Sequence, residues 1–434
     1  MVKVSFLGAC REVGRSAVLV ESEKTDDRIL LDYGIKMEKE AENFPDHVSG
    51  RDLTAIVVTH SHIDHVGGVP IFYISGHVPL YLTKITLDVS EVLLRDMMHI
   101  SSFYLPFEKR EIHKMRTYAE YLKYNNKVKV GQNSYITLLN AGHIPGSAMV
   151  LVEVDNKKIL YTGDMNAIPT QLMNPAVPPA DNIDLLITES TYGIKEHKPR
   201  EEVEKSFINK IISIADNDGR VLVPAFGVSR SQEILMILNK YNVKYPIVVD
   251  GMARKIAKIY KSHNDGFVFR SWSEMIAAFN QSHFIKQRNR FHERKRARNT
   301  NGIIVAPSGM LKGGTARMYA ESMINDPNAA IILVSYQIEN SPGEILLNEG
   351  KYMLYRKNQP KKADVECDID FYDFSSHSGM NELVDFAKKC NFTDKDKRIF
   401  TVHGEEESAT GLAKNLKSLD FSATAAKQSE TYKI

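Results

Sequence analysis

The sequence predicts an α/β protein of two or three domains. Its 434 residues exceed the usual domain length of ~150, and 43% of them are hydrophobic, which is typical of a globular chain. In the first quarter, short apolar segments end in turn residues or charges. From residue 195 to about 360, similar segments alternate with amphipathic stretches. The first pattern indicates a β-meander, and the second indicates a mostly parallel sheet with helices between its strands.

Composition limits the classes of partner. The formal charge is only +2, from 56 Lys and Arg against 54 Asp and Glu, so any basic surface for nucleic acid must be local. No apolar run approaches the ~18 residues of a membrane helix, and Arg11 and Glu12 interrupt the N-terminal segment. We therefore expect a cytoplasmic protein with no membrane partner. Three widely spaced cysteines predict reduced thiols and no thiolate zinc site.

Apolar patterning places the elements of the first half. Residues 84–98 and 107–124 have helical spacing of their apolar side chains and predict helices packed on a sheet. Strands are predicted at 2–7, 17–21, 28–32, 55–58, 135–139, 149–154, 158–162 and 185–189. The segment 55–58 is an apolar, β-branched run typical of a buried strand, so the residues after it lie where a strand ends and a loop opens.

Three histidines and an aspartate follow that buried strand: His60, His62, Asp64 and His65. Neutral imidazole and carboxylate are ligands that zinc prefers, and this spacing can serve two adjacent metal positions. The alternative is a polar loop with chance histidines. Because the chain has only 14 His in 434 residues, such a cluster is improbable by accident.

The pattern His-x-His-x-Asp-His after an apolar strand resembles the motif of the metallo-β-lactamase fold superfamily. The resemblance implies an αββα sandwich in which His143 completes a first metal position with His60 and His62. It implies a second position formed by Asp64, His65 and His403, with Asp164 bridging both. Asp32, at the end of the strand 28–32, would support the histidine loop by hydrogen bonding; the alternative is a turn-forming aspartate.

Three later motifs resemble those of the β-CASP subgroup, whose members are nucleases with a second domain inserted into this fold. They are Thr188–Gly193, Phe374–Gly379 and Thr401–Glu405. The implied organisation is a metallo-β-lactamase domain at 1–194 and 359–434, with a β-CASP domain at 195–358. The chain most resembles the short archaeal relatives of the cleavage and polyadenylation specificity factor nuclease. A zinc-dependent ribonuclease is implied, cutting single-stranded RNA internally and from the 5′ end in processing or decay.

The implied chemistry uses two zinc ions, with manganese as a substitute, held by the seven ligands named above. The catalytic residues would be Asp64, Glu189 and His377. The metals lower the pKa of a shared water, while His377, positioned by Glu189, protonates the leaving oxygen.

The inserted segment has strand patterns at 221–224, 247–250, 303–306 and 331–335 and a helical pattern at 231–241. Residues 224–233, 250–252 and 308–311 resemble the β-CASP domain. One segment departs from the family pattern. Many members carry Gly-Thr-x-Gly-Arg here, whereas residues 340–344 of this chain end in Glu344 instead of arginine. This difference puts in doubt any RNA or partner contact that the family makes there.

Two segments of this domain predict RNA contacts. Residues 286–298, the basic strip, hold seven basic residues against Glu293 and carry a charge of +6; the alternative is a solvated face. Residues 307–317 combine glycines, two cations and a helix start into a candidate anion site; the alternative is a glycine-rich turn capped by Thr315. The predicted RNA-binding residues are Arg230, Lys286, Arg288, Arg290, Arg294, Lys295, Arg296, Ser308, Gly309, Lys312 and Arg317.

Two rival functions remain open. A small-molecule hydrolase of the superfamily would keep the metal ligands but would not need the inserted domain, the basic strip or the motif around His377. A non-catalytic scaffold of an RNA-processing complex is the other rival, although all the ligand positions are present. The resemblance also favours a homodimer through C-terminal surfaces near residues 424–434.

Overall fold

A computed structural model describes residues 1–434 except 38–42, 101–104, 265–267 and 357–358. The chain forms two compact units. Unit 1 comprises residues 1–169, 173–196 and 376–434, and unit 2 comprises residues 170–172 and 197–375.

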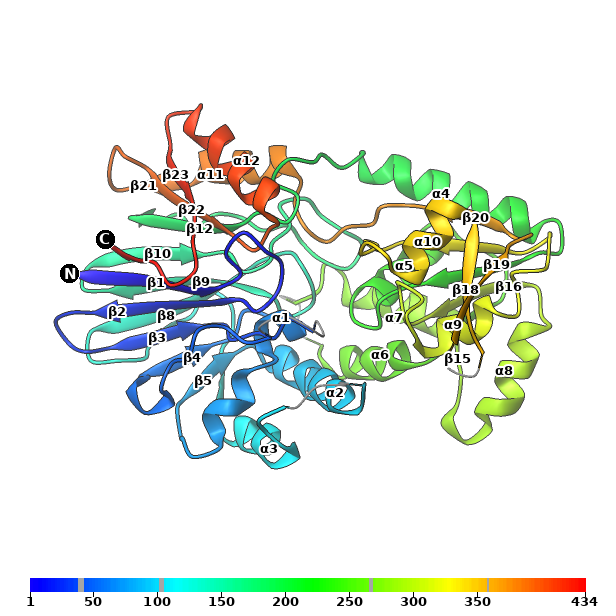
Figure 1. Ribbon diagram of the computed structural model, residues 1–434, viewed down its shortest axis with the longest axis horizontal. Coiled ribbons are helices and arrows are strands. Elements are labelled where there is room, and N and C mark those ends of the chain that lie inside the picture. The colour runs from blue at the N-terminus through cyan, green and yellow to red at the C-terminus, as the bar shows by residue number, and fades with distance from the viewer. Residues whose placement is uncertain (38–42, 101–104, 265–267, 357–358) are drawn as a thin grey trace. The chain divides into compact units, whose positions relative to one another are not determined.

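Unit 1 contains two seven-stranded sheets (Figure 1). The first has the order β24 (Thr431–Lys433), β1 (Val2–Gly8), β2 (Ala17–Ser22), β3 (Arg28–Leu31), β4 (Ala55–Val57), β5 (Leu80–Leu82) and β6 (Ala119–Tyr121). The second has the order β23 (Ser422–Ala425), β22 (Arg398–Val402), β12 (Leu185–Glu189), β10 (Lys157–Tyr161), β9 (Ala148–Val154), β8 (Ser134–Asn140) and β7 (Lys127–Lys129). A small parallel pair, β11 (Asn182–Ile183) and β21 (Asn391–Phe392), lies beside them.

Helices cover the outer faces of both sheets, and α1 (Ile63–Val66) is a single turn after β4. Helices α2 (Lys84–Ile100) and α3 (Lys109–Thr117) share a hydrophobic core with the first sheet, and α11 (Met380–Lys389) and α12 (Glu406–Lys417) share one with the second. A third core lies between the sheets. Strand β4 shows why its segment is apolar throughout, because Ala55 and Val57 enter the inner core while Ile56 enters the outer one. The predicted αββα sandwich is confirmed.

The predicted helix at 107–124 is only partly right. Helix α3 ends at Thr117, and residues 119–121 form β6, which pairs in parallel with β5. Pairing with the sheet edge therefore overrides the helical spacing in the sequence.

Unit 2 is built on a six-stranded, entirely parallel sheet. Its order is β15 (His283–Phe284), β14 (Ile247–Val249), β16 (Gly302–Ala306), β13 (Arg220–Pro224), β17 (Ala330–Leu333) and β20 (Asp368–Phe371). The helices are α4 (Arg200–Ala215), α5 (Arg230–Lys240), α6 (Met252–Ser262), α7 (Trp272–Gln281), α8 (Arg290–Arg298), α9 (Gly314–Ala320) and α10 (Pro342–Glu349). An antiparallel hairpin, β18 (Lys351–Arg356) and β19 (Gln359–Asp364), follows α10. The predicted α/β insertion with a mostly parallel sheet is confirmed.

The limits of the units differ from the predicted domain boundaries. Before the main inserted segment, the last residue of unit 1 is 196, whereas the predicted boundary is 194. The second predicted boundary, residue 358, lies outside the described residues, and residues 359–375 belong to unit 2 instead of unit 1. The reason is β20, which pairs in parallel with β17 and completes the sheet of unit 2. Across the described ranges, the longest apolar helix stretch falls short of what a membrane span requires.

Candidate metal centre

Polar residues of unit 1 gather at the carboxyl ends of several strands. His60, His62 and the turn α1 follow β4, and His143 lies in the loop between β8 and β9. Three further polar residues end or follow strands of the second sheet: Asp164 after β10, Glu189 at the end of β12 and His403 after β22. The structure thus brings together all seven predicted metal ligands and the predicted acid pair.

The first cluster consists of His60, His62, His143 and Asp164. The Nδ1 atom of His62 lies 3.1 Å from Nε2 of His60 and 3.2 Å from Nε2 of His143. Burial lowers the pKa of both His60 and His143 well below the ordinary histidine value, so these rings are neutral and can coordinate a cation. Nitrogens bound tetrahedrally at ~2.0–2.1 Å from zinc would be ~3.3 Å apart, close to these separations.

The second cluster consists of Asp64, His65 and His403. Nε2 of His403 lies 3.3 Å from Oδ2 of Asp64. Asp164 lies against both clusters: Oδ2 is 3.4 Å from Nε2 of His60, whereas Oδ1 is 3.2 Å from Nε2 of His65. Burial disfavours the Asp164 carboxylate, but His403 and His65 hold its pKa well below the ordinary range.

The donor set fits a bound cation. Oδ1 of Asp164 is completely buried and makes no hydrogen bond with the described residues, although ring nitrogens of His65 and His403 lie 3.2 and 3.1 Å away. Burying a carboxylate oxygen without a hydrogen-bond donor costs free energy of folding. A metal ion would offset that cost, because imidazole nitrogens and carboxylate oxygens can coordinate one ion together. Metal binding is therefore what this arrangement of side chains supports.

A buried aspartate holds the histidine loop from below. Asp32 accepts hydrogen bonds from the backbone amide of Thr59 at 2.8 Å, from its hydroxyl at 2.8 Å and from Nδ1 of His65 at 2.8 Å. Tyr161 donates to the same carboxylate at 3.1 Å. Because the Thr59 hydroxyl donates to Asp32, its oxygen accepts from Nδ1 of His60, 3.1 Å away. Both rings thereby present Nε2 to the clusters. The sequence analysis did not predict these roles of Thr59 and Tyr161. The only sequence signal for Thr59 was its position immediately before the histidine motif.

His377 and Glu189 form a closely coupled acid pair. Nδ1 of His377 lies 2.9 Å from each Glu189 oxygen, and Glu189 also accepts from the amide of Met165 at 2.7 Å. Burial lowers the pKa of His377, but the charge of Glu189 outweighs it and raises the pKa to about 9. Nε2 of His377 is 3.9 Å from Oδ2 of Asp164, so a protonated ring can deliver a proton beside the first cluster. The preceding carbonyl, of Ser376, accepts from Nδ1 of His143 at 2.9 Å.

Comparison with known proteins places this centre in a family. Family models match at residues 231–346 (Beta-Casp domain), 362–427 (Zn-dependent metallo-hydrolase RNA specificity domain) and 8–186 (anti-Pycsar protein Apyc1). RNase aCSPSF2 of Saccharolobus solfataricus is 35% identical over 95% of this chain and 81% of that protein. The "Probable RNase MJ4" of Methanocaldococcus jannaschii is 35% identical over 100% of both chains. This chain belongs to the β-CASP family of metal-dependent ribonucleases.

Other relatives of this β-CASP ribonuclease extend the comparison. Transcription termination factor FttA of Methanocaldococcus jannaschii is 30% identical over 96% of this chain and 69% of that protein. A crystal structure titled as a protein of unknown function from Enterococcus faecalis has a TM-score of 0.65 at 14% identity and covers 99% of both chains. At that identity, the solved structure supports the fold alone.

Unit 2 of the β-CASP ribonuclease separates the predicted RNA-binding residues into two groups. Arg230 is only 8% exposed, Arg294 forms a two-bonded ion pair with Asp250 at 2.7 and 3.1 Å, and Arg317 pairs with Glu321 at 2.9 Å. Arg230 is buried, and Arg294 and Arg317 are engaged by carboxylates of the unit, so the prediction that these three side chains contact RNA lacks structural support. Ser308 is half-buried and Gly309 is buried. The exposed cations are Lys286, Arg288, Arg290, Lys295, Arg296 and Lys312.

Glu344, which replaces the arginine of many β-CASP members, has a local role. It lies in the first turn of α10, and its amide donates to the hydroxyl of the capping residue Ser341 at 3.2 Å. A carboxylate there complements the helix dipole. The departure from the family pattern is therefore compatible with a well-formed helix start.

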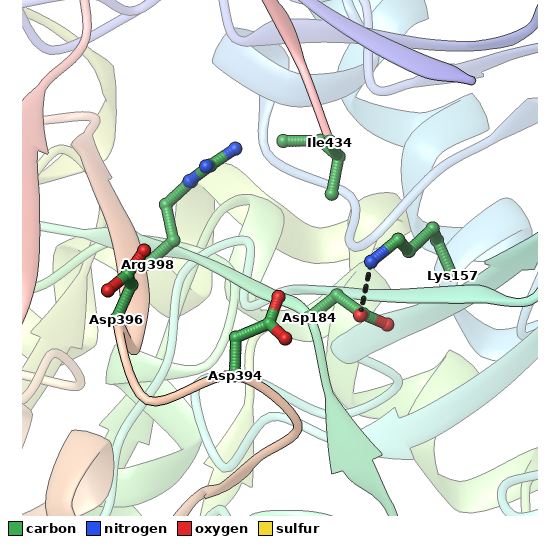
Figure 2. Close-up of a pocket in the computed structure, with 6 residues that line it drawn as sticks. All are labelled: Lys157, Asp184, Asp394, Asp396, Arg398 and Ile434. Carbon is green, nitrogen blue, oxygen red and sulfur yellow. Dashed lines mark hydrogen bonds and ion pairs between the residues drawn. The ribbon is translucent and has the colours of Figure 1, made fainter.

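The β-CASP ribonuclease also has a polar pocket in unit 1 that is distinct from the metal centre (Figure 2). Lys157, Asp184, Asp394, Asp396, Arg398 and Ile434 line it. Lys157 and Arg398 begin β10 and β22, and Asp184 precedes β12, so the pocket lies at the amino ends of the strands whose carboxyl ends carry metal ligands. Asp184 is paired with Lys157 at 2.8 Å. We assign this pocket no part in the chemistry.

Proposed function

We propose that this β-CASP ribonuclease hydrolyses RNA phosphodiester bonds with two zinc ions, internally and from the 5′ end, in RNA processing or decay. The observation that best supports this proposal is the position of Asp164, whose two carboxylate oxygens lie against different clusters, Oδ2 near His60 and Oδ1 near His65. The first position would be held by His60, His62 and His143, and the second by Asp64, His65 and His403, with Asp164 shared. Manganese could replace zinc at the same donors.

Different residues of the metal centre have different roles in the proposed hydrolysis. Metal ions bound here would lower the pKa of a water and neutralise charge on the phosphoryl oxygens. Asp32 and Thr59 fix the ring nitrogens that face the metals. His377 holds a proton at Nε2 for the leaving oxygen, and Glu189 keeps that imidazole oriented and charged. Products would carry 5′-phosphate and 3′-hydroxyl ends.

The observed features weigh against both rival functions. A scaffold without chemistry would not need a fully buried carboxylate and rings that desolvation keeps neutral, and each such group is costly to maintain. A small-molecule hydrolase would not need the exposed cations of unit 2. Hydrolysis of a thioester or lactam, with RNA left intact, would restore that alternative. The homodimer remains a proposal; β23 is an edge strand and offers backbone groups to a second copy.

The basic strip predicts a change in salt dependence. Lys295→Ala with Arg296→Ala should weaken RNA binding and flatten the slope of log affinity against log salt by ~1.4, about 0.7 for each phosphate that the protein no longer neutralises. Arg294 is left unchanged because its substitution would break the ion pair with Asp250. Binding is measured by anisotropy from low to high salt. Lys414→Ala with Lys417→Ala, on exposed positions of α12, is the control. An unchanged slope in the α8 variant means that the strip is only a solvated face.

The loop after β16 predicts a preference for the 5′ end. Lys312 is exposed in the segment between β16 and α9, and its ammonium can bind a terminal phosphate. We expect faster 5′-to-3′ digestion of 5′-monophosphate RNA than of 5′-hydroxyl RNA, and cutting of circular RNA as well. Lys312→Ala should reduce the monophosphate preference more than internal cutting. End-labelled and circular substrates measure both. Equal rates on the two 5′ ends in the native enzyme would remove this loop from the mechanism.

A further inference from the structure

The parallel sheet of unit 2 has a topological switch point, which the metal chemistry does not use. Strands β13 and β17 are neighbours. After β13 the chain passes to β14 on one side of the sheet, whereas after β17 it passes to β20 on the other. Where connections leave adjacent parallel strands in opposite directions, a crevice opens at their carboxyl ends, and ligands of such sheets bind there.

Two aromatic side chains emerge at this position. Phe226 follows β13 by two residues and is 40% exposed, and Tyr336 follows β17 by three residues and is 55% exposed. Most large apolar side chains of these strands are completely buried, as Leu222 and Leu333 are. Two rings at neighbouring strand ends are therefore exposed although the strands themselves are buried, and these rings are available to stack on a planar ligand.

A glycine backbone lies against the two strand ends and forms the floor of this position, with a polar group beside it. A Cβ atom on Gly309 would lie 3.4 Å from the amide nitrogen of Phe226 and 3.2 Å from the hydroxyl of Ser335, so the glycine backbone lies against both strand ends. Ser335 is 3% exposed, and its hydroxyl has no hydrogen-bond partner among the described residues. Gln337 holds the floor by donating to the carbonyls of Gly309 at 3.1 Å and Ser335 at 2.7 Å.

We propose that Phe226 and Tyr336 form a stacking site for bases of single-stranded RNA at the carboxyl edge of the unit 2 sheet. This inference rests on the proposed ribonuclease function and adds a base-binding site to it. Aromatic rings accept any base, because every base has a π face, and the exposed ammonium of Lys312 in the adjoining loop supplies charge for the backbone. An apolar protein partner would not need that cation or the buried hydroxyl, so RNA is the occupant that these groups fit.

The test measures binding of a fluorescent single-stranded RNA to the full chain in the presence of a chelator, which prevents cleavage. Phe226→Leu and Tyr336→Leu keep apolar volume but remove the π face. Each should weaken binding roughly 5- to 100-fold, the range that loss of one stacked base gives. Tyr336→Trp should bind at least as tightly as the native chain. Tyr121→Leu, at an exposed position on β6 of unit 1, is the matched control and should leave the affinity unchanged.

A second arm identifies the interaction as stacking. An RNA that lacks the base bound at this site should bind the native chain more weakly than the intact RNA does. If that base stacks on Tyr336, the abasic RNA should bind Tyr336→Leu no more weakly than it binds the native chain. The salt slope should stay unchanged in both leucine variants, unlike that of the basic-strip variant. Native-like RNA affinity in both leucine variants overturns the stacking site and leaves ribonuclease activity standing. Failure of the native chain to bind or cut RNA overturns the proposed function itself.

Discussion

Asp164→Ala should abolish RNA cleavage, with a decrease of at least ~10³-fold in rate, and should lower the content of both metals. The expectation follows from the position of one carboxylate between two clusters: Oδ2 lies 3.4 Å from Nε2 of His60 and Oδ1 lies 3.1 Å from Nδ1 of His403. Loss of a single preorganised electrostatic group costs ~10² to 10³ in rate, and this group serves both sites. Mass spectrometry of the metals gives a readout that is independent of activity.

The matched control for this prediction is Asp394→Ala, which removes an exposed acid of the pocket at the opposite end of the same strands (Figure 2). It should keep the metals and the rate. Two zinc ions retained in Asp164→Ala with native cleavage would mean that Asp164 is not shared. Loss of only one metal would assign the carboxylate to a single position.

The metal centre could be predicted from sequence because its residues follow apolar strands. The carboxyl ends of β4, β10, β12 and β22 meet in unit 1, so polar residues far apart in the chain converge there. Spacing alone indicated His60, His62, Asp64 and His65. His143, His377 and His403 needed the resemblance, because one histidine in a loop has no periodicity to mark it. Thr59 was missed because nothing in the sequence distinguishes a threonine that orients a metal ligand from a threonine in an ordinary turn.

Tertiary pairing explains where the structure departs from the expectations drawn from the sequence. The segment 359–375 lies in unit 2 because β20 completes the parallel sheet there, and nothing local in the sequence records that partner. Residues 119–121 have helical spacing with the preceding turn but pair with β5. Charge patterning also overstated the free basic surface. Arg294 belongs to the run of cations, yet its guanidinium binds Asp250 at the end of β14, an ion pair between residues 44 positions apart.

His377→Ala should lower the cleavage rate by roughly 10² to 10⁴ while both metals stay bound, the usual contribution of a general acid. Its Nδ1 is 2.9 Å from both oxygens of Glu189, and His377 stands outside the metal clusters found among the described residues, so its removal should not cost a ligand. A substrate with a good leaving group needs less protonation, so the variant should be less impaired on it. His113→Ala, an exposed histidine on α3, is the control and should cleave at the native rate.

Glu189→Gln separates proton donation from packing. The amide keeps the shape of Glu189 but removes the charge that raises the pKa of His377 to about 9, so less of the imidazole is protonated at neutral pH. If the two residues act as one acid pair, the double variant Glu189→Gln with His377→Ala should be little slower than His377→Ala alone. The reason is that rate effects within one catalytic unit do not add. Multiplied rate effects, or an equal decrease on the substrate with the good leaving group, would assign His377 a role other than delivering the proton, such as holding His143 through the Ser376 carbonyl.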